Sequence, residues 1–122
     1  MSKRILYIED NPKDQRLVQK VLSPRGYTLL LADDGEAGIK LATEHCPNLI
    51  LVDIQMPGLD GLETARRLRQ IESCTKTPMV ALTAYSEKYQ RQAYLDAGFT
   101  DYQQKQAGIK PLIDLVARFL TS

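Results

Sequence analysis

Acidic side chains follow directly after two apolar runs of this sequence. Glu9 and Asp10 follow the run at residues 5–8. Asp53 follows the run at residues 49–52. If the two runs are neighbouring parallel strands, their carboxyl ends meet at one edge of the sheet and bring the three carboxylates together. At about 5 Å and an effective dielectric constant of about 20, each pair of carboxylates then repels by roughly 3 kcal/mol, and a cation must offset this repulsion.

Magnesium is the cation that these residues favour. Hard divalent cations bind carboxylate oxygens, and Mg²⁺ suits a site that has few protein carboxylates and keeps positions open for water or phosphate oxygens. Taken alone, Glu9 and Asp10 are equally typical of a helix N-cap before Pro12. The prediction of Mg²⁺ therefore depends on all three carboxylates and not on this pair.

Two more polar side chains follow predicted strands. Thr83 follows the run at 79–82 and offers a hydroxyl group beside the small residue Ala84. Lys105 follows residues 101–104 and offers an ammonium group that can neutralise an anion. Each is an ordinary feature by itself. Together, a nucleophilic carboxylate, a cation site, a hydroxyl donor and a fixed positive charge are the parts required to transfer a phosphoryl group to an aspartate.

The elements that must position these groups alternate between short apolar runs and amphipathic stretches. The runs at 5–8, 28–31, 49–52 and 79–82 are apolar on both faces, as in parallel strands covered by helices. Between and after them lie apolar stripes at helical spacing. The stripes consist of Leu17, Val18, Val21 and Leu22; of Leu62, Ala65, Leu68 and Ile71; and of Leu112, Leu115, Val116, Phe119 and Leu120. We expect an α/β fold in which five βα units form a doubly wound parallel sheet.

Length and composition indicate one domain over residues 1–122. The chain has 122 residues, 43% of them hydrophobic, with 16 Lys and Arg against 15 Asp and Glu. A chain of this size buries roughly 65% of its unfolded surface, which suffices for one core. The near-zero net charge argues against direct binding of nucleic acid or of a membrane surface, since both demand a clustered cationic face. No apolar run approaches the roughly 20 residues that cross a bilayer, so we expect a cytoplasmic location.

Cysteines and clustered arginines have ordinary interpretations. Cys46 and Cys74 are interpreted as reduced thiols, because a domain with its own core needs no cross-link. Arg66, Arg67 and Arg69 lie away from the predicted apolar stripe of their helix. We interpret them as a solvated face, and a docking surface for a kinase or phosphotransfer partner is the alternative.

Four motifs together resemble the receiver domain of bacterial two-component response regulators, in particular the single-domain, chemotaxis-regulator-like members. The match runs from residue 4 to residue 119. The motifs are IEDN at 8–11, LVDIQMPGLDG at 51–61, ALTA at 81–84 and GFTDYQQK at 98–105. The resemblance implies a flavodoxin-like sheet of five parallel strands in the order 2-1-3-4-5. It also implies that Asp53 is the phosphoacceptor, and that Glu9, Asp10 and the backbone carbonyl of Gln55 hold Mg²⁺ with it.

The resemblance assigns three further roles. Thr83 and Lys105 hold the phosphoryl oxygens, and Tyr102 is the switch residue whose rotation accompanies a shift of Thr83. Gln106 departs from the family, in which a proline follows the lysine through a cis peptide bond. A cis bond without proline costs roughly 2.5–4 kcal/mol, so we expect a trans bond after Lys105. Gln103 and Gln104 also depart, because the family has aliphatic residues in its buried fifth strand, and we expect a wetter edge here.

A phosphoacceptor signalling switch is the function that these features predict. A sensor histidine kinase or a histidine phosphotransfer protein would phosphorylate Asp53, and the modified domain would change its binding to a downstream protein. The domain is not an enzyme in the ordinary sense, because it assists only its own phosphorylation and dephosphorylation. We expect Gln55 and Tyr85 to tune the rate of dephosphorylation, and so the lifetime of the phosphoryl group. The alternative is an interaction module that keeps the fold but has lost regulated phosphorylation. The surface of the fourth helix, fifth strand and fifth helix is a candidate homodimer contact.

Overall fold

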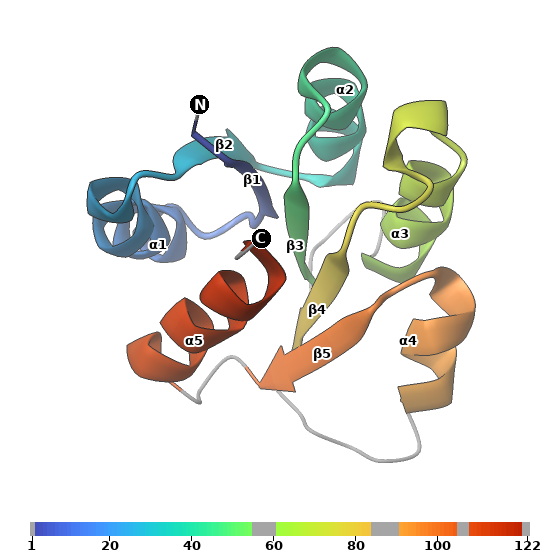
Figure 1. The fold of residues 1–122 in the computed structure, drawn as a ribbon. Helices are drawn as coiled ribbons and strands as arrows, with labels where there is room; N and C mark the ends of the chain where they lie inside the picture. The colour runs from blue at the N-terminus through green and yellow to red at the C-terminus, as the bar shows by residue number, and fades with distance from the viewer. Residues whose placement is uncertain (1, 55–60, 84–90, 105–107, 121–122) are drawn as a thin grey trace.

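A computed structural model describes residues 2–54, 61–83, 91–104 and 108–120. Five parallel strands form one sheet in the order β2-β1-β3-β4-β5, which confirms the expected doubly wound α/β fold (Figure 1). The strands are β1 (Arg4–Ile8), β2 (Thr28–Ala32), β3 (Leu49–Asp53), β4 (Met79–Thr83) and β5 (Asp101–Gln104). The helices are α1 (Pro12–Leu22), α2 (Gly35–His45), α3 (Gly61–Arg69), α4 (Arg91–Ala97) and α5 (Ile109–Leu120). Short 3₁₀ turns lie at Ser23–Arg25 and Glu72–Cys74.

Strand alternation divides the core into two halves, one on each face of the sheet. Helices α1 and α5 cover one face, and α2, α3 and α4 cover the other (Figure 1). The half under α1 and α5 contains Ile5, Tyr7, Leu49, Leu51, Val80 and Leu82 from the strands. The half under the other three helices contains Leu6, Ile8, Ile50, Val52, Met79 and Ala81. Because successive side chains of a strand point to opposite faces, this pattern also fixes where the polar residues at the strand ends point.

Parallel register brings the carboxyl ends of the central strands to one edge. Ile8 of β1 is level with Val52 of β3. Asp53, the next residue of β3, is level with Leu82 of β4. The residues that follow β1 therefore lie beside Asp53, as the sequence predicts.

Asn11 caps α1. Its side-chain oxygen accepts hydrogen bonds from the backbone N–H groups of Lys13, at 2.9 Å, and Asp14, at 3.4 Å, and Pro12 occupies the first turn. An asparagine oxygen bound to these N–H groups is the usual arrangement of an N-cap. The N-cap residue of α1 is therefore Asn11, which corrects the interpretation of Glu9 and Asp10 as the cap.

Arg69 is not part of a solvated face, which corrects our interpretation of the three arginines. Its guanidinium donates to the backbone carbonyls of Gly98, at 2.8 Å, Cys74, at 2.8 Å, and Thr77, at 2.6 Å. A Cβ on Gly98, whose φ is +109°, would lie 2.6 Å from the Cγ of Arg69. Arg69 thus joins the end of α3 to the segments that precede β4 and β5. Arg66 and Arg67 are half exposed and pair with Glu63, as a solvated face does.

Two further expectations have different outcomes. Leu17, which we place in the buried stripe of α1, is 46% exposed. The wetter edge at β5 is confirmed, because Gln103 is partly buried and Gln104 is exposed.

In the described part of the chain, the helices are too short or too polar to span a membrane.

Candidate functional site

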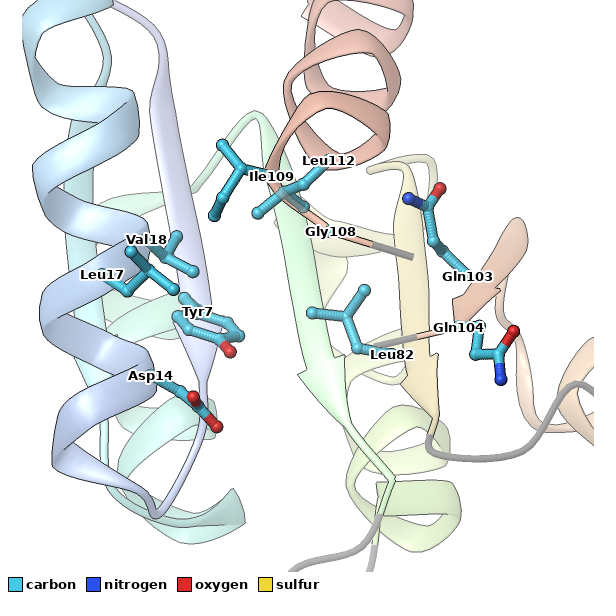
Figure 2. Close-up of a pocket in the computed structure, with 10 residues that line it drawn as sticks. All are labelled: Tyr7, Asp14, Leu17, Val18, Leu82, Gln103, Gln104, Gly108, Ile109 and Leu112. Atoms are coloured by element: carbon cyan, nitrogen blue, oxygen red, sulfur yellow. The ribbon is translucent and has the colours of Figure 1, made fainter. Parts of the chain in front are cut away.

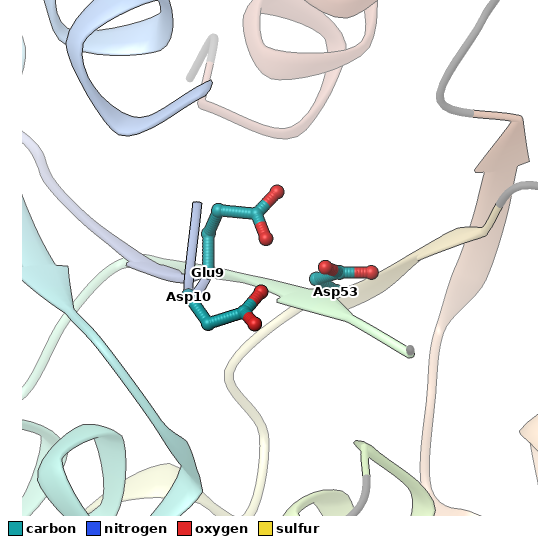
Figure 3. Close-up of side chains that lie close together, drawn as sticks. All are labelled: Glu9, Asp10 and Asp53. Carbon is teal, nitrogen blue, oxygen red and sulfur yellow. The ribbon is translucent and has the colours of Figure 1, made fainter. Parts of the chain in front are cut away.

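Three carboxylates meet at the carboxyl ends of β1 and β3 (Figure 3). Glu9, Asp10 and Asp53 each place an oxygen within 4.8 Å of the others. Glu9 is fully buried, Asp53 is 4% exposed, and Asp10 is exposed. Two carboxylates of the cluster are therefore shielded from solvent, and the third, that of Asp10, is accessible to it. The sequence predicted this meeting of the three side chains.

Strand alternation explains why the two buried carboxylates share a space. Glu9 lies two residues after Tyr7, and Asp53 lies two residues after Leu51. Tyr7 and Leu51 both belong to the core half under α1 and α5. Glu9 and Asp53 therefore point to this same face, where α1 and α5 limit the access of water.

Tyr7 is a contact of the site that sequence reasoning missed. Its hydroxyl donates a hydrogen bond to Oε1 of Glu9 at 3.1 Å, and Tyr7 itself is 1% exposed. Burial, together with the negative charges of Glu9, Asp14 and Asp53, raises the pKa of Tyr7 far above its usual value. The phenol therefore stays protonated and remains a donor.

Gln15 is a second missed contact. Its side-chain amide donates to the backbone carbonyl of Glu9 at 2.5 Å and to Oδ1 of Asp33 at 2.8 Å. These bonds join the first turns of α1 to the ends of β1 and β2. Gln15 thus fixes the backbone from which the Glu9 and Asp10 side chains project. A polar residue on the sheet-facing side of a predicted helix was the signal available in the sequence.

The cluster fits a small divalent cation. All three side chains offer carboxylate oxygens, the ligands that Mg²⁺ and Ca²⁺ prefer. An ion with metal–oxygen distances of about 2.1 Å separates opposite ligand oxygens by about 4.2 Å. Oxygens within 4.8 Å of one another are thus spaced to share one ion after small movements or through a water ligand.

Thr83 lies at the end of β4 and is 1% exposed. It follows Met79 and Ala81 in the strand alternation, so its side chain points to the face under α2, α3 and α4. The hydroxyl of Tyr94 in α4 donates to Oγ1 of Thr83 at 3.4 Å. Thr83 is thus adjacent to the carboxylate cluster along the sheet edge but turned towards the other core half.

Aromatic rings link Thr83 to β5. The Tyr94 ring centroid lies 5.7 Å from that of Tyr102 and 6.2 Å from that of Phe99, with the Phe99 ring nearly perpendicular. Tyr102 is partly buried in the same core half. The predicted switch residue therefore contacts Tyr94, which in turn contacts Thr83. No pattern in the sequence indicates this contact between Tyr94 and Thr83.

Several predicted residues lie outside the described part of the chain. They are Gln55, Tyr85, Lys105 and Gln106, together with the peptide bond between the last two. Their proposed roles continue to depend on the family resemblance.

A cavity of about 190 Å³ opens between α1 and α5, and its lining includes Tyr7, the residue that donates to Glu9. Tyr7, Asp14 and Leu17 line one side, and Leu82 and Leu112 line the other (Figure 2). Figure 2 shows the Tyr7 hydroxyl directed towards the carboxyl end of the sheet, on the side where Asp14 lies. The cavity accounts for the exposure of Leu17, because the helices leave space between their facing sides.

Known proteins are similar to this chain in sequence and in fold. The family model described as the response regulator receiver domain matches residues 5–117 of this chain. The chain is 34% identical over 119 residues to sensor histidine kinase GacS of Pseudomonas protegens, and this match covers 95% of the chain and 13% of GacS. The chain thus spans a small part of that relative.

Two solved structures resemble the chain closely. One is the receiver domain of sensor histidine kinase PA1611 of Pseudomonas aeruginosa, with a magnesium ion coordinated in its active site cleft. It is 32% identical, with a TM-score of 0.89 and complete coverage of both chains. The other is a co-crystal structure of the Saccharomyces cerevisiae phosphotransfer protein Ypd1 with the receiver domain of its downstream response regulator Ssk1. Identity there is 25% and the TM-score 0.89, over 97% of this chain and 88% of the matched one. This chain belongs to the response regulator receiver family of two-component signalling.

Proposed function

We propose that this domain is a phosphoacceptor switch in which Asp53 receives a phosphoryl group. The observation that carries the proposal is the carboxylate cluster. Asp53 ends a central strand, is buried, and has an oxygen within 4.8 Å of oxygens of Glu9 and Asp10. A carboxylate in this position is a nucleophile beside a cation site, as phosphoryl transfer to an aspartate requires.

The proposed transfer changes two bonds. A carboxylate oxygen of Asp53 forms a bond to phosphorus, and the phosphorus–nitrogen bond of a phosphohistidine breaks. The imidazole leaves with the electron pair of that bond. In the later hydrolysis, a water oxygen bonds to phosphorus, the bond to the Asp53 oxygen breaks, and free phosphate and the carboxylate are released with a proton.

Glu9 and Asp10 hold Mg²⁺ together with Asp53 in this proposal, and the backbone carbonyl of Gln55 adds a ligand. When bound, Mg²⁺ supplies positive charge that offsets both the carboxylates and the phosphoryl oxygens. The fit of the three described carboxylates to one ion supports this assignment, as does the magnesium ion in the receiver domain of PA1611.

Thr83 and Lys105 bind the phosphoryl oxygens, and Tyr102 moves with Thr83 when the domain switches. For Thr83 to reach the phosphoryl group, its hydroxyl must turn from Tyr94 towards Asp53. The chain of contacts from Thr83 through Tyr94 to Tyr102 supports such coupling, because a shift at one end changes the packing at the other.

The phosphoryl donor is a sensor histidine kinase or a histidine phosphotransfer protein. The likeness to receiver domains of kinases and to the Ssk1 receiver crystallised with Ypd1 supports both sources. A downstream protein or a second copy of the chain reads the switched state at the surface of α4, β5 and α5. Residues 1–122 act as one cytoplasmic receiver domain, which modifies only itself and turns over no separate substrate.

Mass spectrometry of the intact protein tests the proposal. With Mg²⁺ and acetyl phosphate, we expect the wild-type protein to gain the mass of one phosphoryl group and Asp53→Asn to gain none. Asp114→Asn, which changes an exposed aspartate of α5, is the matched control and should be phosphorylated like the wild type. A wild-type protein that gains no mass would indicate a non-switching interaction module. A gain that persists in Asp53→Asn would exclude Asp53 as the acceptor.

A further inference from the structure

The buried tyrosine of β1 and the buried carboxylate of the site form one unit. The Tyr7 hydroxyl lies 3.1 Å from Oε1 of Glu9, within the usual range for a hydrogen bond. The two residues alternate onto the same face, with Ile8 between them pointing to the other. Both are almost completely shielded from water. A hydrogen bond to an ionised group in such surroundings is stronger than one in water.

The other oxygen of Glu9 has a longer contact. The backbone N–H of Asn11 lies 3.5 Å from Oε2, beyond the usual 2.7–3.2 Å of an N–H···O bond. Of these two contacts, the one from Tyr7 constrains the carboxylate more strongly. The hydrogen bond to Oε1 restrains the rotation of the carboxyl group and with it the direction of Oε2.

The tyrosine ring is itself held in place. It packs in the core half that contains Val18 of α1 and Leu82 of β4, and it lines the cavity between α1 and α5. In Figure 2 the ring lies beside α1 with its hydroxyl directed towards the carboxyl end of the sheet. The hydroxyl therefore has little freedom to leave Glu9. A residue of similar size without a hydroxyl would fill the same space and leave the carboxylate without this donor.

We propose that Tyr7 is a positioning residue of the cation site, whose hydroxyl orients the Glu9 carboxylate so that it contributes to Mg²⁺ binding with Asp10 and Asp53. This inference depends on the proposed function only in taking the carboxylate cluster as a Mg²⁺ site. A hydrogen-bond donor that orients a metal-ligating side chain, without binding the metal itself, commonly contributes about 10- to 100-fold to metal affinity. Because Tyr7 carries no charge, it can hold Glu9 without competing with the cation electrostatically.

Calorimetric titration with MgCl₂ tests the inference. We expect Tyr7→Phe to raise the dissociation constant for Mg²⁺ by about tenfold, because phenylalanine keeps the ring and removes only the donor. Tyr27→Phe is the matched control. Tyr27 is a partly buried tyrosine before β2, on the opposite edge of the sheet, and its replacement should leave the dissociation constant within twofold of wild type.

A double-mutant cycle separates positioning from a general effect on packing. In a Glu9→Gln background, Tyr7→Phe should change the dissociation constant for Mg²⁺ by less than twofold, because no carboxylate remains to be oriented. An equal loss in both backgrounds would show that Tyr7 acts through packing and would overturn the inference. A dissociation constant for Tyr7→Phe within twofold of wild type would also overturn it, as would a wild-type protein that binds no Mg²⁺.

The inference and the proposed function fail in different ways. If Tyr7→Phe weakens Mg²⁺ binding as expected but the wild type gains no phosphoryl mass, the positioning role stands and the phosphoacceptor function fails. If the wild type gains the mass at Asp53 but Tyr7→Phe binds Mg²⁺ normally, the function stands and the positioning role fails.

Discussion

Replacing Arg69 with leucine is expected to lower the free energy of unfolding by about 3 kcal/mol. The guanidinium donates to three backbone carbonyls in the segments before β4 and β5. The carbonyls of Gly98 and Thr77 lose this donor when it is removed, whereas that of Cys74 keeps the backbone N–H of Thr77 at 3.3 Å. A buried carbonyl left unpaired costs about 1–3 kcal/mol, and leucine cannot replace any of the hydrogen bonds. Partial access of water to this region reduces the sum of these costs.

Urea denaturation followed by circular dichroism measures this effect. Arg67→Leu is the matched control, because Arg67 lies on the same helix and its side chain is half exposed in an ion pair with Glu63 at 3.2 Å. Exposed ion pairs of this kind contribute well under 1 kcal/mol, so the control should change the free energy of unfolding by about 0.5 kcal/mol or less. Equal effects of the two substitutions would refute the structural role of Arg69.

Replacing Asp53 with asparagine is expected to raise the free energy of unfolding by about 2 kcal/mol in buffer without divalent cations. Asp53 and Glu9 are buried and, with Asp10, place oxygens within 4.8 Å of one another. At that separation and an effective dielectric constant of about 20, each ionised pair repels by about 3 kcal/mol. Asparagine removes one charge and keeps the size of the side chain. Solvent at the exposed Asp10 reduces the gain.

Urea denaturation in EDTA and in excess Mg²⁺ tests this prediction. The gain in stability should be present in EDTA and should shrink or reverse in Mg²⁺, because the wild type binds the ion more tightly than the variant does. Asp114→Asn, which removes an exposed charge of α5, should show no such dependence on the cation. A clear loss of stability in Asp53→Asn in EDTA would mean that the carboxylates do not repel as described.

The strands and the three carboxylates could be predicted because each depends on local pattern. A run that is apolar on both faces has few alternatives to a central parallel strand, and residues 49–52 show this clearly. Once β1 and β3 are neighbours, their register alone brings Glu9 and Asp10 beside Asp53. The chemistry of the site thus follows from which residues end the strands.

Other contacts depend on backbone atoms or on residues distant in the sequence. Arg69 donates to backbone carbonyls that lie up to 29 residues away in the sequence. The periodicity of its own helix does not predict these hydrogen bonds. In the sequence, Tyr7 is indistinguishable from the apolar residues of a buried strand. Its contact with Glu9 depends on the direction of a single hydroxyl, which the pattern does not predict. Tyr94 contacts Thr83 only through the packing of α4 on the sheet. The exposure of Leu17 reflects the space between α1 and α5, which no single segment specifies.

An anomalous difference map from a crystal grown with Mn²⁺ in place of Mg²⁺ is the most direct test of the site. We predict a peak enclosed by the carboxylates of Glu9, Asp10 and Asp53, with an oxygen of Asp53 bound to the ion directly. A fully occupied peak elsewhere, or no peak at these carboxylates under conditions in which the protein binds the ion in solution, would contradict the assignment of the cation site on which the proposed phosphorylation depends.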